Sequence, residues 1–267
     1  MSNFLTSVFA KAKSENRAVL IGYLPAGFPS QRAAKKIVKS MIAGGVDIME
    51  IGYPYSDPVM DGPVIQAASE QALKNGSGAH EVFDLLRNTV ELGVPSLVMS
   101  YWSPIEKFGV AKFAGAIATS GGSGVITPDL TIEESAEWRA VCAKDGIARV
   151  YVVAPSSSDA RLPLVTKECA GFIYAASLMG VTGTRDSLSG NAGALVARIR
   201  KNSDLPVAVG LGVSTKEQAQ EVAKYADGVI VGSAFIKLIQ QHGAGRKGLK
   251  KVKELAHSLA EGVRSAK

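Results

Sequence analysis

The chain contains little cysteine, little histidine and no long apolar run. Its 267 residues include two cysteines and three histidines. Cys142 and Cys169 lie far apart in helix-like sequence with no histidine nearby, so we expect buried free thiols in a reducing compartment, not a metal pair. The sequence also lacks an 18-residue apolar run and a secretory signal. We therefore expect a cytoplasmic protein without a membrane span.

Positive charge is in excess but is not concentrated. The formal net charge is +6, and only residues 245–253 are dense in lysine and arginine. They open a segment whose apolar residues fall at helical spacing: Leu249, Val252, Leu255, Leu259 and Val263. No aromatic residues interleave with these lysines, as a base-stacking surface would need. We interpret the segment as the solvated face of an amphipathic helix, and a nucleic-acid site as the less favoured alternative.

Eight short apolar runs recur along the chain. They lie at 18–23, 46–51, 95–100, 123–127, 148–153, 171–176, 206–210 and 227–231. Runs of this kind are typical of parallel strands that are covered on both faces. Helical patterns separate them, for example at 30–43, 79–92, 131–144 and 214–225. Ser30, Thr131 and Ser214 are the expected caps, and Glu134 completes a capping box with Thr131.

This alternation predicts an α/β fold, a (β/α)₈ TIM barrel formed by one domain over residues 1–267. Two further helices are expected, at 2–14 before the first strand and at 62–74 in the second βα connection. The main alternative is an open doubly wound sheet. Such a sheet normally carries G-x-G-x-x-G after its first strand, and "LPAGFPS" at 24–30 does not match that pattern.

Two carboxylates lie where a barrel has its active site, beyond or near the carboxyl end of the second strand. Glu50 interrupts an apolar strand, and a buried carboxyl has a raised pKa that suits it to acid–base catalysis. A structural ion pair is the alternative. Asp61 follows in the next loop. Its "DGP" context is common in turns, so a structural turn and a functional role are equally favoured for this residue. Asp57 in the same loop is better explained as a brace or a partner contact.

Glycines follow the last two strands. Gly210, Gly212 and Ser214 precede one helical pattern, and Gly232 and Ser233 precede another. Glycine allows close backbone approach, and amide groups at a helix start attract anions. These two loops are the common phosphate site of barrel enzymes, so we predict a phosphate site here, with ordinary βα turns as the alternative.

Three tyrosines at strand ends, Tyr23, Tyr101 and Tyr174, could line a pocket for a flat apolar substrate, although each alone is more often a core residue. The histidines lie away from strand ends, and no lysine occupies a strand interior, which argues against a metal cluster and against a Schiff base. The predicted chemistry therefore uses carboxylates, without metal or cofactor.

The segment "EIGYPYSDPVMDGPVIQ" at 50–66 resembles the signature of the tryptophan synthase alpha chain family, E-[LI]-G-x-P-[FY]-S-D-P-x-x-D-G-P-x-I-Q. Further matches occur in the family's order and cover nearly the whole chain: "YLPAGFP" at 23–29, "GVTG" at 180–183, "GLGVS" at 210–214 and "VGSA" at 231–234. The resemblance implies a barrel that splits indole-3-glycerol phosphate into indole and glyceraldehyde 3-phosphate. It implies an αββα complex in which indole passes to a beta chain that carries pyridoxal phosphate.

The resemblance also implies roles for individual residues. Glu50 would be the acid–base catalyst and Asp61 its partner carboxylate. The other implied substrate-binding residues are Thr182, Gly183, Gly212, Gly232 and Ser233 around the phosphate or in the loop after the sixth strand, and Tyr23, Tyr101 and Tyr174 around indole and the glycerol chain. Tyr53 and Met60 depart from the family pattern in the loop expected to meet the beta chain, so coupling to that chain could differ.

Three alternatives remain at this stage. An isomerase of histidine biosynthesis would need aspartates at the ends of strands one and five, where this chain has "GYLPAG" and "VVAPSS". The chain could act mainly as an allosteric subunit, with the loops at 53–62 and 178–192 as communicating elements. It could also be a stand-alone lyase that releases indole.

Overall fold

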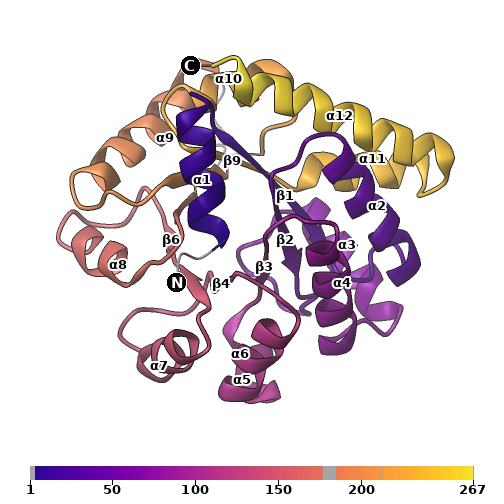
Figure 1. The fold of residues 1–267 in the computed structure, drawn as a ribbon, viewed down its shortest axis with the longest axis horizontal. Helices are drawn as coiled ribbons and strands as arrows, with labels where there is room; N and C mark the ends of the chain where they lie inside the picture. The colour runs from indigo at the N-terminus through magenta and orange to yellow at the C-terminus, as the bar shows by residue number, and fades with distance from the viewer. Residues whose placement is uncertain (1–3, 177–184, 211, 267) are drawn as a thin grey trace.

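The structure is a computed structural model that describes residues 4–176, 185–210 and 212–266 (Figure 1). Its strands form one parallel sheet in the order β5-β4-β3-β2-β1-β9-β8-β7-β6. The strands are β1 Val19–Pro25, β2 Ile48–Gly52, β3 Ser96–Met99, β4 Gly124–Ile126, β5 Ala148–Val150, β6 Val152–Val153, β7 Ile173–Ala176, β8 Val207–Gly210 and β9 Gly228–Val231. Each predicted strand is therefore present.

The two edges of this sheet are one stretch of chain. Only Tyr151 separates β5 from β6; β5 pairs with β4, and β6 pairs with β7. The Tyr151 carbonyl also accepts a hydrogen bond from the Tyr174 N–H at 3.3 Å. The stretch 148–153 thus acts as a single strand that closes the sheet, and the predicted eight-stranded barrel is confirmed.

Helices cover the barrel: α1 lies across one end, and most of the others form an outer ring (Figure 1). They are α1 Phe4–Ser14, α2 Gln31–Ala43, α3 Pro63–Lys74, α4 Ala79–Glu91, α5 Trp102–Phe108, α6 Val110–Thr119, α7 Ala136–Lys144, α8 Leu162–Glu168, α9 Arg185–Arg200, α10 Lys216–Ala223, α11 Ser233–His242 and α12 Arg246–Arg264. The two predicted additional helices are α1 and α3. The segment 245–253 enters α12, whose apolar face is buried, as the helical interpretation expected.

Two helix starts differ from the prediction. The helix expected from 131 begins at Ala136: the Thr131 hydroxyl does donate to the Glu134 carboxylate at 3.0 Å, but the pair braces a turn. The helix expected from 214 begins at Lys216, and Thr215 is its cap because Thr215 accepts the Gln218 N–H at 3.3 Å. Ser30 caps α2 as predicted.

Side chains alternate between two hydrophobic layers. In β1, Val19 and Ile21 pack inside the barrel, while Leu20 and Leu24 pack against the outer helices. Helix α1 closes the amino end of the interior, since Phe9 contacts Phe172 with ring centroids 5.6 Å apart. The carboxyl end of the interior is therefore the end left for a ligand.

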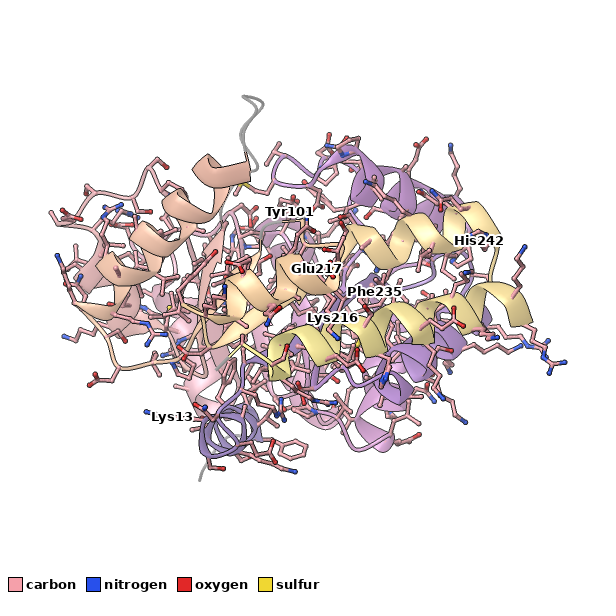
Figure 2. The ribbon with its side chains drawn as sticks, turned by 90° about the horizontal axis from the view of Figure 1, so that it is seen from above. Lys13, Tyr101, Lys216, Glu217, Phe235 and His242 are labelled. Carbon is pink, nitrogen blue, oxygen red and sulfur yellow. The ribbon has the colours of Figure 1, made fainter. Side chains whose placement is uncertain are left out.

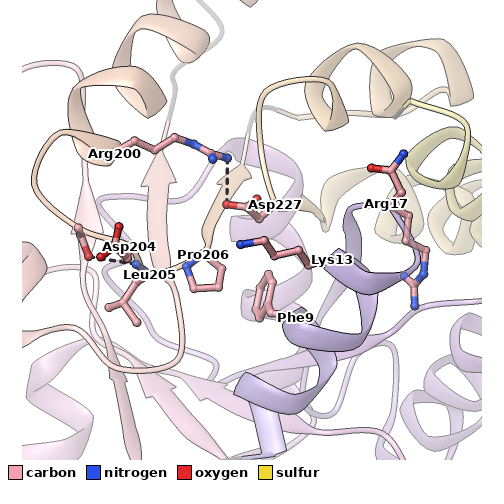
Figure 3. Close-up of a pocket in the computed structure, with 10 residues that line it drawn as sticks. Phe9, Lys13, Arg17, Arg200, Asp204, Leu205, Pro206 and Asp227 are labelled. Carbon is pink, nitrogen blue, oxygen red and sulfur yellow. Dashed lines mark hydrogen bonds and ion pairs between the residues drawn. The ribbon is translucent and has the colours of Figure 1, made fainter.

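A cavity of about 580 Å³ lies between α1 and the amino ends of β8 and β9 (Figure 3). The Arg200 guanidinium spans its wall to the Asp227 carboxylate at 3.0 Å, and the same carboxylate accepts the Val207 N–H. Figure 2 shows Lys13 of α1, another lining residue, at the opposite end of the barrel from Tyr101. The cavity is thus remote from the predicted catalytic end.

The structure also bears on the expectations for the cysteines and for a membrane span. Cys142 and Cys169 are both buried free thiols. Among the described residues, no helix combines the length and apolar character that crossing a membrane requires.

Candidate active site

Glu50 points into the barrel near its carboxyl end. Ile48 belongs to the interior layer and Met49 and Ile51 to the outer layer, so the period-two alternation of β2 turns Glu50 inward. In the sheet register, Glu50 lies between Tyr23 of β1 and Leu97 of β3. Its side chain is 1% exposed. The carboxyl group is therefore held in the barrel interior by its strand.

The surroundings of Glu50 favour the protonated form. Neither carboxyl oxygen has a hydrogen-bond partner among the described residues. Burial raises the pKa of Glu50 to about 8, and no described cation offsets that effect. The structural ion pair considered for this residue does not occur among the described residues. At neutral pH, Glu50 is a buried acid that can donate a proton and, once ionised, take one back.

Tyr23 and Tyr174 complete this end of the interior. Both hydroxyls have raised pKa values, chiefly because of burial and then because of the negative charges of Glu50 and Asp61. The two tyrosines are therefore neutral and lie within electrostatic range of both carboxylates. The structure therefore brings these two tyrosines and the two carboxylates together at one end of the barrel, and their role in a substrate pocket stays a prediction.

Glycines make room for these tyrosines. A Cβ atom at Gly52 would lie 2.3 Å from the Tyr23 hydroxyl oxygen, and one at Gly210 would lie 2.5 Å from the Tyr174 hydroxyl oxygen. A Cβ at Gly232 would lie 2.9 Å from the Tyr23 ring. The sequence predicts Gly232 as a phosphate-binding residue. That Gly232 also makes room for the Tyr23 ring follows only from the register between neighbouring strands.

Asp61 ends the loop after β2 and is partly buried. Its main-chain N–H donates to the Pro58 carbonyl at 3.0 Å, and its carbonyl accepts from the Gln66 side chain at 2.8 Å. Burial raises the pKa of Asp61 to about 6, although a hydrogen bond from Tyr101 opposes that rise. Asp61 is therefore mostly ionised at neutral pH, in contrast to Glu50.

Tyr101 follows β3 and binds the loop that carries Asp61. Its hydroxyl oxygen accepts the Met60 N–H at 2.9 Å, and its ring packs on Tyr55 with centroids 5.2 Å apart. Asp129, which follows β4, accepts the Trp102 N–H and so fixes the start of α5. Asp129 is thus a structural brace in this arrangement.

The two predicted glycine loops differ in their free amide groups. At α10, the Gln218 side chain already accepts the N–H groups of Ser214 and Thr215, at 2.8 and 3.3 Å. At α11, Gly232 is the cap residue and supplies no side-chain cap, and Ser233 begins the helix. The start of α11 is therefore the better anion site. Gly212 has φ +70°, a left-handed conformation that favours glycine. Thr182 and Gly183 lie outside the described residues.

Comparison with known proteins decides the family. The tryptophan synthase alpha chain family model matches residues 9–264. The chain belongs to the tryptophan synthase alpha chain family. The family is that of a lyase which cleaves indole-3-glycerol phosphate to indole and glyceraldehyde 3-phosphate, in the last steps of tryptophan biosynthesis. The predicted family and activity are confirmed, and the isomerase alternative is excluded.

Individual relatives are similar to this chain over nearly its full length. The alpha chain of Streptomyces avermitilis is 52% identical and covers 97% of this chain and 94% of its own. That of Thermobifida fusca is 50% identical, with 96% of each chain covered. Among solved structures, Mycobacterium tuberculosis tryptophan synthase has a TM-score of 0.91 and 42% identity, with 99% of each chain covered. The alpha subunit of Legionella pneumophila has a TM-score of 0.90 and 30% identity, with 98% and 99% covered.

Proposed function

We propose that Glu50 is the acid–base catalyst of the retro-aldol cleavage. In the protonated form it donates its proton to C3 of the indole ring, which prepares the bond from C3 to the glycerol carbon for cleavage. The resulting carboxylate takes the proton from the hydroxyl on that glycerol carbon, which becomes the aldehyde carbon as the bond breaks. A buried carboxyl with a pKa of about 8 supports both steps, because it is neutral before the reaction and basic after it.

We assign the partner role to Asp61. Its pKa of about 6 leaves it ionised at neutral pH, so its carboxylate can accept the indole N–H. Protonation at C3 puts positive charge on the ring nitrogen, and a nearby carboxylate stabilises that charge most in the transition state. The difference between the two pKa values supports these roles, with Glu50 as the acid and Asp61 as the anion.

The remaining proposed contacts surround these two groups. Tyr23, Tyr101 and Tyr174 would line the indole pocket, with Tyr174 nearest the glycerol chain. The amide groups of Gly232 and Ser233, at the start of α11, would hold the phosphate, together with Gly212. Thr182 and Gly183 would contribute from the loop after β7. The uncapped start of α11, at the same barrel end as Glu50, supports this placement.

We propose that the exposed loop before α3 meets the beta chain in an αββα heterotetramer. Val59 is 81% exposed and Met60 52%, and a cavity of about 480 Å³ lies beside them between Tyr55 and Leu73. Exposed apolar side chains next to a hollow are typical of an interface. Pyridoxal phosphate would belong to the beta chain alone, with no cofactor in this one.

We also propose that residues 1–267 form one domain in the cytoplasm. A single sheet takes strands from Val19 to Val231, which supports one domain. Two buried free cysteines agree with a reducing compartment.

The test is indole release from indole-3-glycerol phosphate by the purified chain, alone and with a beta chain. Slow release that the beta chain accelerates supports the subunit role. Fast release by the chain alone would instead favour a stand-alone lyase. No release under either condition would overturn the proposed function.

A further inference from the structure

The Tyr101 hydroxyl group contacts the exposed loop before α3, which carries Asp61, the proposed catalytic anion. The Tyr101 oxygen accepts the Met60 N–H at 2.9 Å, and hydrogen bonding between the Tyr101 hydroxyl and the Asp61 side chain lowers the pKa of Asp61 against the effect of burial. A tyrosine hydroxyl has one proton to donate and lone pairs to accept with, so both bonds can exist together. The Tyr101 hydroxyl thereby interacts with two consecutive residues of the loop, Met60 and Asp61.

The tyrosine that carries this hydroxyl is itself firmly placed. Tyr101 is 5% exposed and directly precedes α5, the helix whose first N–H is held by Asp129. The Tyr55 ring covers one side of the Tyr101 ring. Met60, by contrast, is half exposed and Val59 almost fully exposed. The rigid partner is therefore the tyrosine, and the loop is what it restrains.

We propose that Tyr101 is a positioning residue, whose hydroxyl holds the loop that carries Asp61 and so places the Asp61 carboxylate for catalysis. This inference rests on the proposed role of Asp61. It adds a role for the hydroxyl group to the proposed place of the Tyr101 ring in the indole pocket. The hydroxyl acts through Asp61 and through the main chain of the adjacent residue, so its loss with the ring retained should change substrate binding little.

The groups that face Asp61 determine the direction of the effect. Tyr101 is its one described hydrogen-bond donor, and burial acts against it. Tyr23 and Tyr174 lie within electrostatic range as neutral groups, and Glu50 is neutral below a pH of about 8. Removal of the Tyr101 hydroxyl leaves burial without its opposing hydrogen bond. The pKa of Asp61 then rises above about 6, and less of the anion exists at neutral pH.

The experiment compares the isolated wild-type chain with its Tyr101→Phe and Tyr55→Phe variants, without the beta chain, because Tyr55 borders the proposed interface. Tyr55→Phe keeps the stacked ring and is the matched control. The acidic limb of kcat/KM against pH should lie near 6 in wild type and move up by about one pH unit in Tyr101→Phe. The smaller ionised fraction of Asp61 should lower kcat about twofold at pH 7 and about 10-fold at pH 5, while KM stays within about twofold. The Tyr55→Phe profile should match wild type.

A direct titration separates this inference from the proposed function. Carboxyl ¹³C NMR on protein labelled at aspartate, with Asp61→Asn to assign the signal, measures the pKa of Asp61 without any turnover. A higher value in Tyr101→Phe than in Tyr55→Phe supports the inference even if no indole is released. Equal Asp61 pKa values in the two folded variants, or an unmoved acidic limb in Tyr101→Phe, would overturn it.

Discussion

Glu50→Gln is the substitution that tests the proposed chemistry most directly. Glutamine has nearly the same shape but can neither donate nor take a proton at neutral pH. A positioned acid–base group contributes about 10²–10⁴ in rate, so kcat for indole release should fall by at least about 100-fold with KM little changed. Near-normal turnover in Glu50→Gln would refute the assigned role.

The same substitution should change how stability depends on pH. An ordinary glutamate has a pKa of 4.5, and burial raises that of Glu50 to about 8 in the folded chain. Between these values the folded state binds more protons than the unfolded state, so wild type loses stability as pH rises from about 4.5 to 8. At about 1.4 kcal/mol per pH unit, the loss from pH 5 to pH 8 is about 3–4 kcal/mol.

Glu50→Gln removes this dependence, because a buried amide does not titrate. Urea unfolding at pH 5 and pH 8 should therefore show wild type losing about 3–4 kcal/mol more than the variant. Asp61 titrates in both proteins and cancels in the comparison. Glu91→Gln, at an exposed glutamate of α4, is the control and should follow wild type. Parallel pH profiles for wild type and Glu50→Gln would show that Glu50 is not a buried acid.

Three further substitutions test other parts of the site. Asp61→Asn should lower kcat about 100-fold and abolish the acidic limb near pH 6 in the kcat/KM profile, since no carboxylate remains to titrate; a retained limb would assign it to another group. Val59→Asp should leave indole release by the isolated chain unchanged but weaken beta-chain binding about 10-fold, measured by titration calorimetry, and unchanged affinity would place the interface elsewhere. Gly210→Ala should displace the Tyr174 hydroxyl, reduce kcat/KM and cost about 1–3 kcal/mol in urea unfolding; a variant as stable and active as wild type would contradict the tight contact.

The barrel could be predicted because its strands are continuous apolar runs that end at glycine, proline or polar residues. The run 46–51 illustrates this: Asp47 precedes the strand that begins at Ile48, Glu50 is the charged residue within that strand, and its position near the carboxyl end indicated function. The split of 148–153 at Tyr151 left the prediction correct, since both halves serve one strand position.

Helix boundaries were less predictable. Thr131 and Glu134 satisfy the capping-box pattern and do interact, yet the helix begins at Ala136. The same local bonds can stabilise a turn, so the pattern alone does not decide which forms. At α10 the cap moved by one residue, because Ser214 and Thr215 both suit that position and Gln218 lies where it can bond to either.

Contacts between distant residues could not be predicted at all. Nothing local indicates that Gly52 must be small to admit Tyr23, or that Tyr101 reaches the main chain of Met60, 41 residues away. Both contacts depend on the register of neighbouring strands and on the path of a long loop. Residue types at strand ends predicted candidate members of the site, while the arrangement of these residues relative to one another required the fold.

The two carboxyl groups owe their different roles to what surrounds them. Glu50 lies on a strand inside the barrel without a described hydrogen-bond partner, so burial acts unopposed and the group stays protonated. Asp61 lies on a loop at the rim, where Tyr101 donates to it and keeps it ionised at neutral pH. A donor placed beside Glu50 would stabilise the protein above pH 5 but would lower the pKa that makes this residue an acid. The proposed role of Glu50 therefore requires a carboxyl group without a strong donor beside it, and the stability that Glu50 costs above pH 5 follows from that requirement.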